Sequence, residues 1–138
     1  MSAVDAELTE FMHGTMPLTT VLGFEALAAS PEEVSVRAGW DPSRCTSGGL
    51  LHGGVLMTLA DTAGAWCAFL NIPPGAGTTT IESKTNFLRA VRSGHVVATA
   101  RRLHAGRTIV VIETELRDDD AKLVAKVTQT QAVLSPPS

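Results

Sequence analysis

One segment, Leu50 to Leu70, constrains the fold of this chain most strongly, because it is apolar on nearly every side yet contains an aspartate near its centre. The segment is long enough to cross a membrane, but a central aspartate costs a lone span about 2.5–3.5 kcal/mol. No basic residue directly flanks it to anchor it at a membrane surface. A helix that is apolar all round must instead be covered by other elements of its own protein. We therefore predict a buried helix over Leu51–Leu70, stopped by Asn71–Gly75.

The sequence after this helix is typical of β-strands. Its β-branched residues gather in four runs that are separated by short turns rich in glycine or aspartate. Connections this short place neighbouring strands antiparallel to one another. We predict the four strands at Thr78–Ala90, His95–Leu103, Arg107–Arg117 and Lys122–Val133, with turns at Arg92–Gly94, Ala105–Gly106 and Asp118–Asp120.

The residues before the helix predict a helical segment and further strands. Residues 1–20 have apolar residues at helical spacing, which indicates a short amphipathic helix that ends near His13. Gly23–Ala29 and the alternating run Val34–Trp40 predict strands, and Asp41–Gly49 is a polar loop.

Together these elements predict an α+β fold. With five or six antiparallel strands and one apolar helix, the economical way to bury the helix is a strongly curved sheet that wraps around it. The length of 138 residues is that of one domain, so residues 1–138 are expected to form a single domain.

Charge is distributed unevenly along the chain. Between Ile81 and Val110 six basic residues accompany one acid, whereas the first 33 residues contain six acids and no base. This asymmetry disfavours a nucleic-acid binder, whose surface is usually basic throughout. It fits either a local site for a small phosphorylated anion or a solvated strand face. Two cysteines are too few for a disulfide framework, and the first basic residue, Arg37, comes too late for a leader peptide, so we expect a cytoplasmic protein.

The run Leu51-His52-Gly53-Gly54 marks the entrance to the long helix. The first turn of a helix has backbone N–H groups without intrahelical partners and carries partial positive charge. Glycine lets another group approach that backbone closely. The entrance therefore predicts either a site for a carbonyl oxygen or oxyanion, or a glycine-rich turn chosen for tight packing alone.

Asp61 lies in the middle of the predicted helix. A carboxylate among apolar residues needs a reason: a chemical role, a hydrogen bond to Thr58 or Thr62, or a position facing solvent. Gly53 and Asp61 are about 12 Å apart along a helix, so within one chain they cannot act on the same carbonyl. Two antiparallel helices related by a two-fold axis would bring Gly53 of one chain toward Asp61 of the other. If both residues are catalytic, the active site is shared between subunits.

The segment HGGVLMTLAD (52–61), followed by Thr80, NFLR (86–89) and AGRT (105–108), resembles the hotdog-fold acyl-CoA thioesterases. Within them it is similar to the phenylacetate-degradation (PaaI-like) and 4-hydroxybenzoyl-CoA thioesterase branch, over roughly Gly23 to Leu134. The resemblance implies the hotdog fold, in which a curved antiparallel sheet wraps around one long central helix. It also implies an acyl-CoA substrate, homodimers that pair into tetramers, and no metal, cofactor, nucleic acid or membrane partner.

The resemblance implies a role for each matching residue. The backbone N–H of Gly53 would polarise the thioester carbonyl, and His52 would orient the loop. Asp61 of the partner subunit would act as nucleophile or general base, and Thr80 would position the attacking water. The residues expected along the substrate, with the two arginines at the coenzyme A phosphates, are Arg89, Arg107, Gly54, Ser47, Phe87, Leu88 and Thr108.

The sequence departs from this branch at one position. Six residues before the histidine these enzymes usually have an Asn or Gln that helps to hold the carbonyl, whereas this chain has Thr46 with Ser47 beside it. Losing one such donor typically costs about 10²–10³ in rate, so a hydroxyl substitutes for the amide or this contact is weaker. This departure is the main argument for a non-catalytic acyl-CoA binding module. A hotdog hydratase or dehydratase on acyl thioesters also stays open, because it would share the fold and the thioester substrate. The acyl group itself is not specified, and Trp66 and Phe69 either belong to the core or border its pocket.

Overall fold

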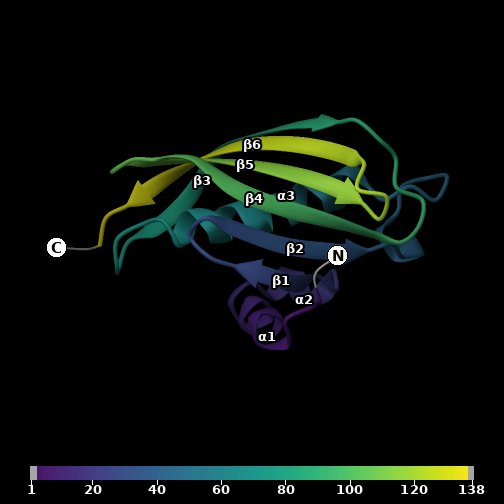
Figure 1. Ribbon diagram of the computed structural model, residues 1–138, viewed down its shortest axis with the longest axis horizontal. Helices are drawn as coiled ribbons and strands as arrows, with labels where there is room; N and C mark the ends of the chain where they lie inside the picture. The colour runs from purple at the N-terminus through teal and green to yellow at the C-terminus, as the bar shows by residue number, and fades with distance from the viewer. Residues whose placement is uncertain (1–2, 137–138) are drawn as a thin grey trace.

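The computed structural model describes residues 3–136, so the two residues at each end of the predicted domain lie outside the described residues. Over this range six antiparallel strands form a sheet in the order β1-β2-β4-β5-β6-β3, which curls around the helix α3 (Gly53–Phe69) (Figure 1). The strands are β1 (Glu25–Ala29), β2 (Glu33–Gly39), β3 (Gly77–Phe87), β4 (His95–Ala105), β5 (Ile109–Asp118) and β6 (Leu123–Leu134), and a 3-10 turn occupies Pro42–Arg44.

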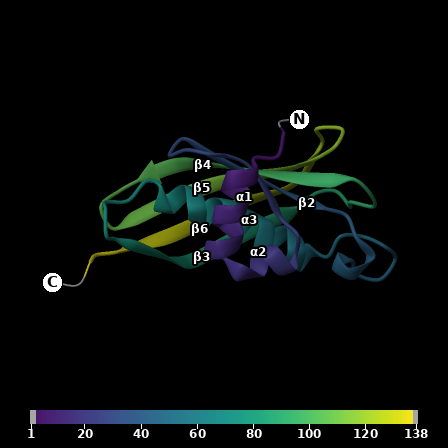
Figure 2. The ribbon, with the colours of Figure 1, turned by 90° about the horizontal axis from the view of Figure 1, so that it is seen from below.

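Two short helices, α1 (Ala6–Thr15) and α2 (Pro17–Val21), precede the sheet, and α1 packs against β1. Both lie nearest the viewer in Figure 2. Asp5 caps α1, because its carboxylate accepts a hydrogen bond from the Leu8 N–H at 2.9 Å. The predicted helical segment is confirmed in its described part, but it consists of two helices, since Pro17 lacks an N–H and is suited to begin a new one.

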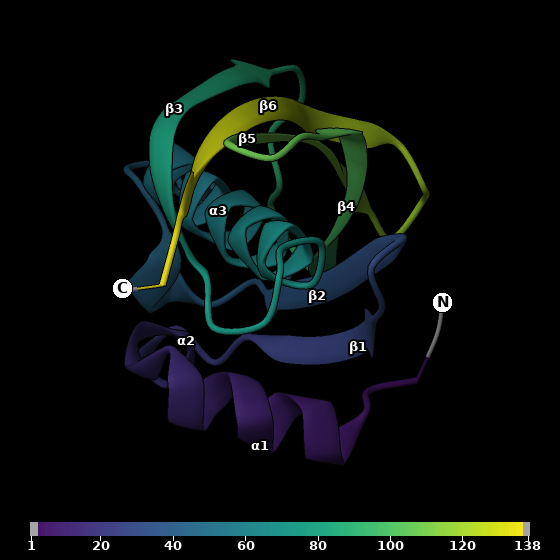
Figure 3. The same cartoon turned by 90° about the vertical axis from the view of Figure 1, so that its left-hand side faces the viewer.

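The helix α3 runs through the inside of the curl, with β2 below it and β6 and β3 above it in Figure 3. Its buried residues, such as Leu59 and Ala63, pack with inward-facing strand residues such as Val96 and Ile112 in a hydrophobic cluster. The predicted α+β fold, a curved sheet around a central helix, is therefore confirmed. The helix begins at Gly53, slightly later than predicted, because His52 takes the N-cap position. Within residues 3–136 no helix is long and apolar enough to cross a membrane.

One predicted pairing is wrong. The sequence predicts a tight turn at Arg92–Gly94 between neighbouring strands, but β3 ends at Phe87 and pairs with β6, whereas β4 pairs with β2 and β5. Residues 88–94 instead cross the end of the sheet, where two N–H groups at their start donate to the Val124 carbonyl. Adjacent strands are only about 4.8 Å apart, so a segment of this length passes β6 and β5 easily. The other predicted hairpins, β4–β5 and β5–β6, are confirmed, and β1 pairs antiparallel with β2.

The turn between β4 and β5 also differs from its predicted position. β4 continues to Ala105, and β5 begins at Ile109, so Arg107 and Thr108 lie in the turn and not in a strand. The turn is closed by a hydrogen bond from the Gly106 N–H to the Ile109 carbonyl at 2.8 Å. Both side chains are therefore exposed at the end of the sheet.

Candidate active site

The entrance of α3 leaves one backbone donor free. His52 is the N-cap residue, and its Nδ1 accepts a hydrogen bond from the Gly54 N–H at 2.8 Å, which places the proton of a neutral ring on Nε2. The His52 carbonyl accepts from Val55 and Leu56. The N–H of Gly53 makes no hydrogen bond within residues 3–136. This N–H lies at the positive end of the helix dipole and is available to a bound oxygen.

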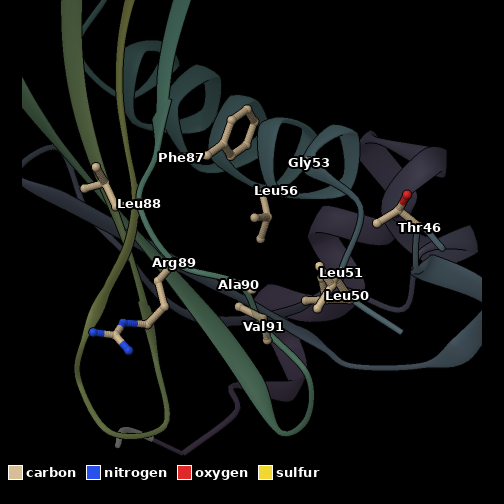
Figure 4. Close-up of a pocket in the computed structure, with 10 residues that line it drawn as sticks. All are labelled: Thr46, Leu50, Leu51, Gly53, Leu56, Phe87, Leu88, Arg89, Ala90 and Val91. Carbon is tan, nitrogen blue, oxygen red and sulfur yellow. The ribbon is translucent and has the colours of Figure 1, made fainter. Parts of the chain in front are cut away.

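A pocket of about 390 Å³ opens beside Gly53. Figure 4 shows Phe87 turned toward the first turn of α3, whereas the Arg89 guanidinium extends away from Gly53. A Cβ atom on Gly53 would lie 3.1 Å from the Phe87 Cζ, so glycine leaves room for this ring. The pocket is mostly apolar, and its lining residues are Thr46, Leu50, Leu51, Gly53, Leu56, Phe87, Leu88, Arg89, Ala90 and Val91.

Thr46 lines this pocket from the loop before α3. Its side chain is exposed, and its hydroxyl makes no hydrogen bond in the described part of the chain. Ser47 is exposed in the same loop but does not line the pocket. Of the two residues whose hydroxyl could replace the amide found in similar enzymes, only Thr46 lines the pocket.

Asp61 is exposed on α3, and its carboxylate is bonded to two strands of the sheet. Oδ1 accepts a hydrogen bond from the Thr80 hydroxyl on β3 at 3.2 Å and another from the Gln129 Nε2 on β6 at 2.8 Å. The hydroxyls of Thr58 and Thr62 donate to helix carbonyls one turn earlier and not to Asp61. The structure thus brings Asp61 and Thr80 together.

Sequence reasoning missed two residues of this network, Gln129 and Gln131. The Gln131 Nε2 donates to the Thr80 Oγ1 at 2.7 Å, and both glutamine side chains are at most 1% exposed. The signal that could have found them is the alternation TQTQ (128–131), which puts two amides on one face of a strand. Buried amides need polar partners, and here the partners are Asp61 and Thr80.

Within one chain the two parts of the candidate site are separate. Gly53 and Asp61 are eight residues apart on α3, which corresponds to about 12 Å at 1.5 Å per residue. Asp61 does not line the pocket beside Gly53. A single chain therefore presents a free N–H and a carboxylate that cannot reach the same bond.

The predicted arginines lie at opposite ends of the sheet. The Arg89 N–H donates to the Val124 carbonyl near the start of β6, whereas the turn that contains Arg107 is bonded through Thr108 to Val133 near its end. These positions along β6 are roughly 30 Å apart at 3.3 Å per residue. Both arginine side chains are exposed, and one chain does not bring them to a common ligand.

Other reactive groups lie outside these two places. Burial raises the pKa of the Cys67 thiol, which disfavours the thiolate that a nucleophile requires. Within residues 3–136 no three His, Cys, Asp or Glu side chains are grouped as metal ligands. The chemistry available at the candidate site is that of a backbone N–H, hydroxyls, amides and a carboxylate.

A curved antiparallel sheet of six strands wrapped around one long central helix is the hotdog fold. Residues 48–125 match the family model of the thioesterase superfamily. The chain therefore belongs to the thioesterase superfamily, a family of hydrolases.

Solved structures that are similar to this chain cover nearly all of it. A thioesterase of Haemophilus influenzae is 28% identical, with a TM-score of 0.88, over 99% of this chain and 95% of its own. A thioesterase of Pseudomonas aeruginosa, solved as a variant with one glutamine replaced by alanine, is 30% identical, with a TM-score of 0.85, over 91% and 93%. A conserved protein of Pseudomonas aeruginosa is 34% identical, with a TM-score of 0.80, over 85% and 93%. These similarities and the family model confirm the hotdog-fold thioesterase superfamily.

Proposed function

We propose that this protein is an acyl-CoA thioesterase that hydrolyses an acyl-CoA to the free acid and coenzyme A. One observation carries the proposal: the chain keeps the Gly53 N–H free and holds the Asp61 carboxylate by two donors. The N–H polarises the thioester carbonyl. In one route Asp61 attacks the carbonyl carbon, the carbon–sulfur bond breaks to release the coenzyme A thiolate, and water then cleaves the resulting anhydride to the free acid and the regenerated carboxylate. In the other route Asp61 removes a proton from a water that attacks the carbonyl carbon, the carbon–sulfur bond breaks, and the proton passes to the departing thiolate. Coenzyme A enters as part of the substrate.

Two subunits share each site in this proposal. A two-fold axis that exchanges Gly53 and Asp61 passes midway between them, near Met57, whose side chain is 40% exposed. In the same chain Phe87 lies beside Gly53, and Thr80 is bonded to Asp61. An axis that also exchanges these two residues passes through β3 between residues 83 and 84.

The unpaired edge strand β3 supports the same two-fold axis. In the described chain β3 ends the strand order, and its outer edge is unpaired along 11 residues. An exposed edge of this length is a template for another strand, and it includes the exposed apolar side chain of Ile81. Antiparallel pairing of β3 with a second copy about this axis would bring Thr80 of one chain toward Phe87 of the other. The same two-fold axis would therefore relate both the α3 helices and the β3 strands of two chains, which favours a homodimer with two shared sites.

The dimer would also bring together the two arginines that lie far apart in one chain. It would bring Arg89 of one subunit to the end of the partner's sheet that carries Arg107. The pyrophosphate and 3′-phosphate of coenzyme A would bind between them, since guanidinium groups pair with phosphate oxygens in a bidentate manner. Pairing of two such dimers into a tetramer is part of this proposal, and light scattering of the purified protein measures it.

Mixing two inactive variants is expected to restore activity, because the site is shared. Asp61→Asn removes the carboxylate, and Gly53→Pro removes the N–H. A mixed dimer has one site with both groups intact and one with both changed. Random assortment makes about half of the dimers mixed, so we expect about a quarter of wild-type activity after joint refolding. The measurement is thiol release, with native mass spectrometry to count mixed dimers. Mixed dimers without recovered activity would contradict a shared site.

An apolar hollow of about 330 Å³ lies one helical turn beyond Asp61. Asp61 and Ala65 are four residues apart and therefore share a face of α3. The rings of Phe11 on α1 and Trp66 on α3 contact each other with centroids 5.8 Å apart. We propose that this hollow takes an apolar acyl group and favours an aromatic one, because aromatic rings pack well against each other. Its lining residues are Phe11, Thr15, Met16, Ala65, Trp66 and Phe69.

Filling the hollow is expected to separate large from small acyl groups. Ala65→Leu adds side-chain volume at its wall, and overpacking of this kind typically costs about 1–3 kcal/mol. We expect kcat/KM for phenylacetyl-CoA or benzoyl-CoA to fall about 10- to 100-fold, with the value for acetyl-CoA changed by less than about threefold. Equal losses on both substrates would place the acyl group elsewhere.

Release of free thiol from a panel of phenylacetyl-, benzoyl-, hydroxybenzoyl-, hexanoyl- and acetyl-CoA tests the proposed function directly. Hydrolysis of any of these supports a thioesterase. Binding of the panel without thiol release would support the acyl-CoA binding module, with Thr46 as the first residue to examine. Conversion of a crotonyl-type thioester without thiol release would support the hydratase. That alternative is disfavoured because the Nδ1 of His52 is engaged in capping α3.

A further inference from the structure

Gln129 is fully buried on β6 and reaches across the inside of the sheet to α3. Its Nε2 donates to the Asp61 Oδ1, but its Oε1 has no hydrogen-bond partner in the described part of the chain. A buried carbonyl oxygen without a partner costs free energy of folding. An apolar side chain of similar size would therefore suit the core better, which indicates that the amide is kept for the bond that its nitrogen makes.

Gly64 makes this bond possible. A Cβ atom at Gly64 would lie 1.7 Å from the Gln129 Oε1, so no other residue fits beneath the amide in this position. Glycine inside a helix is less favourable than alanine. Two features that each cost stability, Gly64 and the unpartnered Oε1, thus occur together below Asp61.

Two donors converge on a single oxygen of Asp61. The Thr80 Oγ1 accepts from Gln131, so its one proton is directed to the Asp61 Oδ1, where Gln129 also donates. The opposite orientation of the Gln129 amide would set its carbonyl oxygen against the carboxylate. Within residues 3–136 no group donates to Oδ2. One carboxylate oxygen is therefore anchored from the sheet, and the other is left unbonded.

We propose that Gln129 is a positioning residue that anchors the Asp61 Oδ1 and so selects Oδ2 as the oxygen that reacts. This inference rests on the proposed function. Without the amide, the carboxylate turns more freely about its side-chain bonds, and Oδ2 is less often in the reactive geometry. Because Gln129 is buried and Asp61 lies between it and the surface, its loss is expected to slow turnover and not to weaken substrate binding.

Gln129→Met keeps the length of the side chain and removes the donor. We expect kcat to fall about 10- to 100-fold, with KM changed by less than about twofold. The melting temperature is expected to be unchanged or higher, because the unpartnered carbonyl is removed as well. Thr114→Val is the matched control, since it removes another buried, unpartnered oxygen on β5 without touching Asp61, and its kcat is expected to stay at the wild-type value.

A second substitution, Gln129→Glu, tests the hydrogen bond to Asp61 separately from any change in packing. The carboxyl group introduced by Gln129→Glu can donate to Asp61 only when it is protonated. The ratio of its kcat to that of the wild type is therefore expected to rise as the pH falls from 8 toward 5. A ratio that does not vary with pH would contradict anchoring by a donated hydrogen bond.

Gly64→Ala tests the same bond from the helix side. Alanine favours the helix, yet its Cβ displaces the Gln129 amide, so we expect kcat to fall about 10-fold or more without loss of the fold. The double variant Gly64→Ala/Gln129→Ala no longer has the steric clash between the alanine Cβ and the amide, but it still lacks the donor to Asp61. Its kcat is therefore expected to stay low. Recovery of kcat in the double variant would mean that the amide does not act as a donor, and would overturn the proposal.

Asp61→Asn in the same assay separates the two levels of inference. If Asp61→Asn is inactive and Gln129→Met has the wild-type kcat, the positioning role is overturned and the thioesterase proposal stands. If both lose turnover while Thr114→Val does not, both are supported. If the wild type releases no thiol, or Asp61→Asn retains full activity, the proposed mechanism fails and the positioning role fails with it.

Discussion

Asp61→Asn is expected to reduce thioester turnover by about 10²–10⁴-fold while leaving the fold intact. A neutral amide can neither attack the carbonyl carbon nor accept a proton from water, and general base catalysis alone is typically worth this factor. The fold is expected to persist because the asparagine side-chain oxygen can accept the same two hydrogen bonds, from Thr80 and Gln129. Steady-state thiol release and the circular dichroism spectrum measure the two effects.

The effect of losing a charge must be separated from the effect of losing this carboxylate. Glu7→Gln is a matched control, because it removes one exposed negative charge from α1 at a residue that lines neither pocket of the candidate site. Its turnover is expected to stay within about twofold of the wild-type value, as is usual for an isolated surface charge. Substrate binding by Asp61→Asn, measured by calorimetry, is expected to survive. Near-native turnover of Asp61→Asn would remove the carboxylate from the mechanism.

The parts of the fold that the sequence predicts well are those governed by local patterns. The all-round apolar character of residues 51–70 requires a covered helix, and β-branched runs between short turns require strands. The pairing of β3 with β6 was not predictable in this way. Strand neighbours depend on which contacts the whole sheet satisfies, and residues 88–94 are long enough to cross the sheet end as well as to form a turn.

The sequence also predicts only part of the candidate site. The pattern HGG followed by Asp61 indicates both functional groups, and the family resemblance adds Thr80, which does contact Asp61. Gln129 was not predicted as a site residue, because a glutamine in an alternating strand is usually assigned to the solvent-exposed face. Only the strand register in the folded protein places its side chain on the inner face, toward α3. Gly64 was also not predicted as a site residue. In the sequence it is one of several small residues in the helix, and only the structure shows how close it lies to the Gln129 amide.

Gly53→Pro is expected to reduce kcat by about 10²–10³-fold, the usual effect of removing one oxyanion donor. Gly53 is the first residue of α3, a position that favours proline, and proline has no N–H to donate. The preceding residue, His52, has φ −63° and ψ 134°, which is the conformation that a following proline requires. The substitution therefore removes the donor and leaves the helix start in place.

Gly53→Ala isolates the contribution of this N–H from that of the space beside it. Alanine and proline both add a Cβ that approaches the Phe87 Cζ, at 3.1 Å before any adjustment, but only alanine keeps the N–H. Phe87 is 51% exposed within one chain, and the contact demands an adjustment of only a few tenths of an ångström. We expect Gly53→Ala to retain turnover within about fivefold of the wild-type value. Equal losses in the two variants would assign the role of Gly53 to its lack of a side chain, and the polarising group would then have to be sought at Thr46, the other polar residue of the pocket that lies beside the entrance of α3.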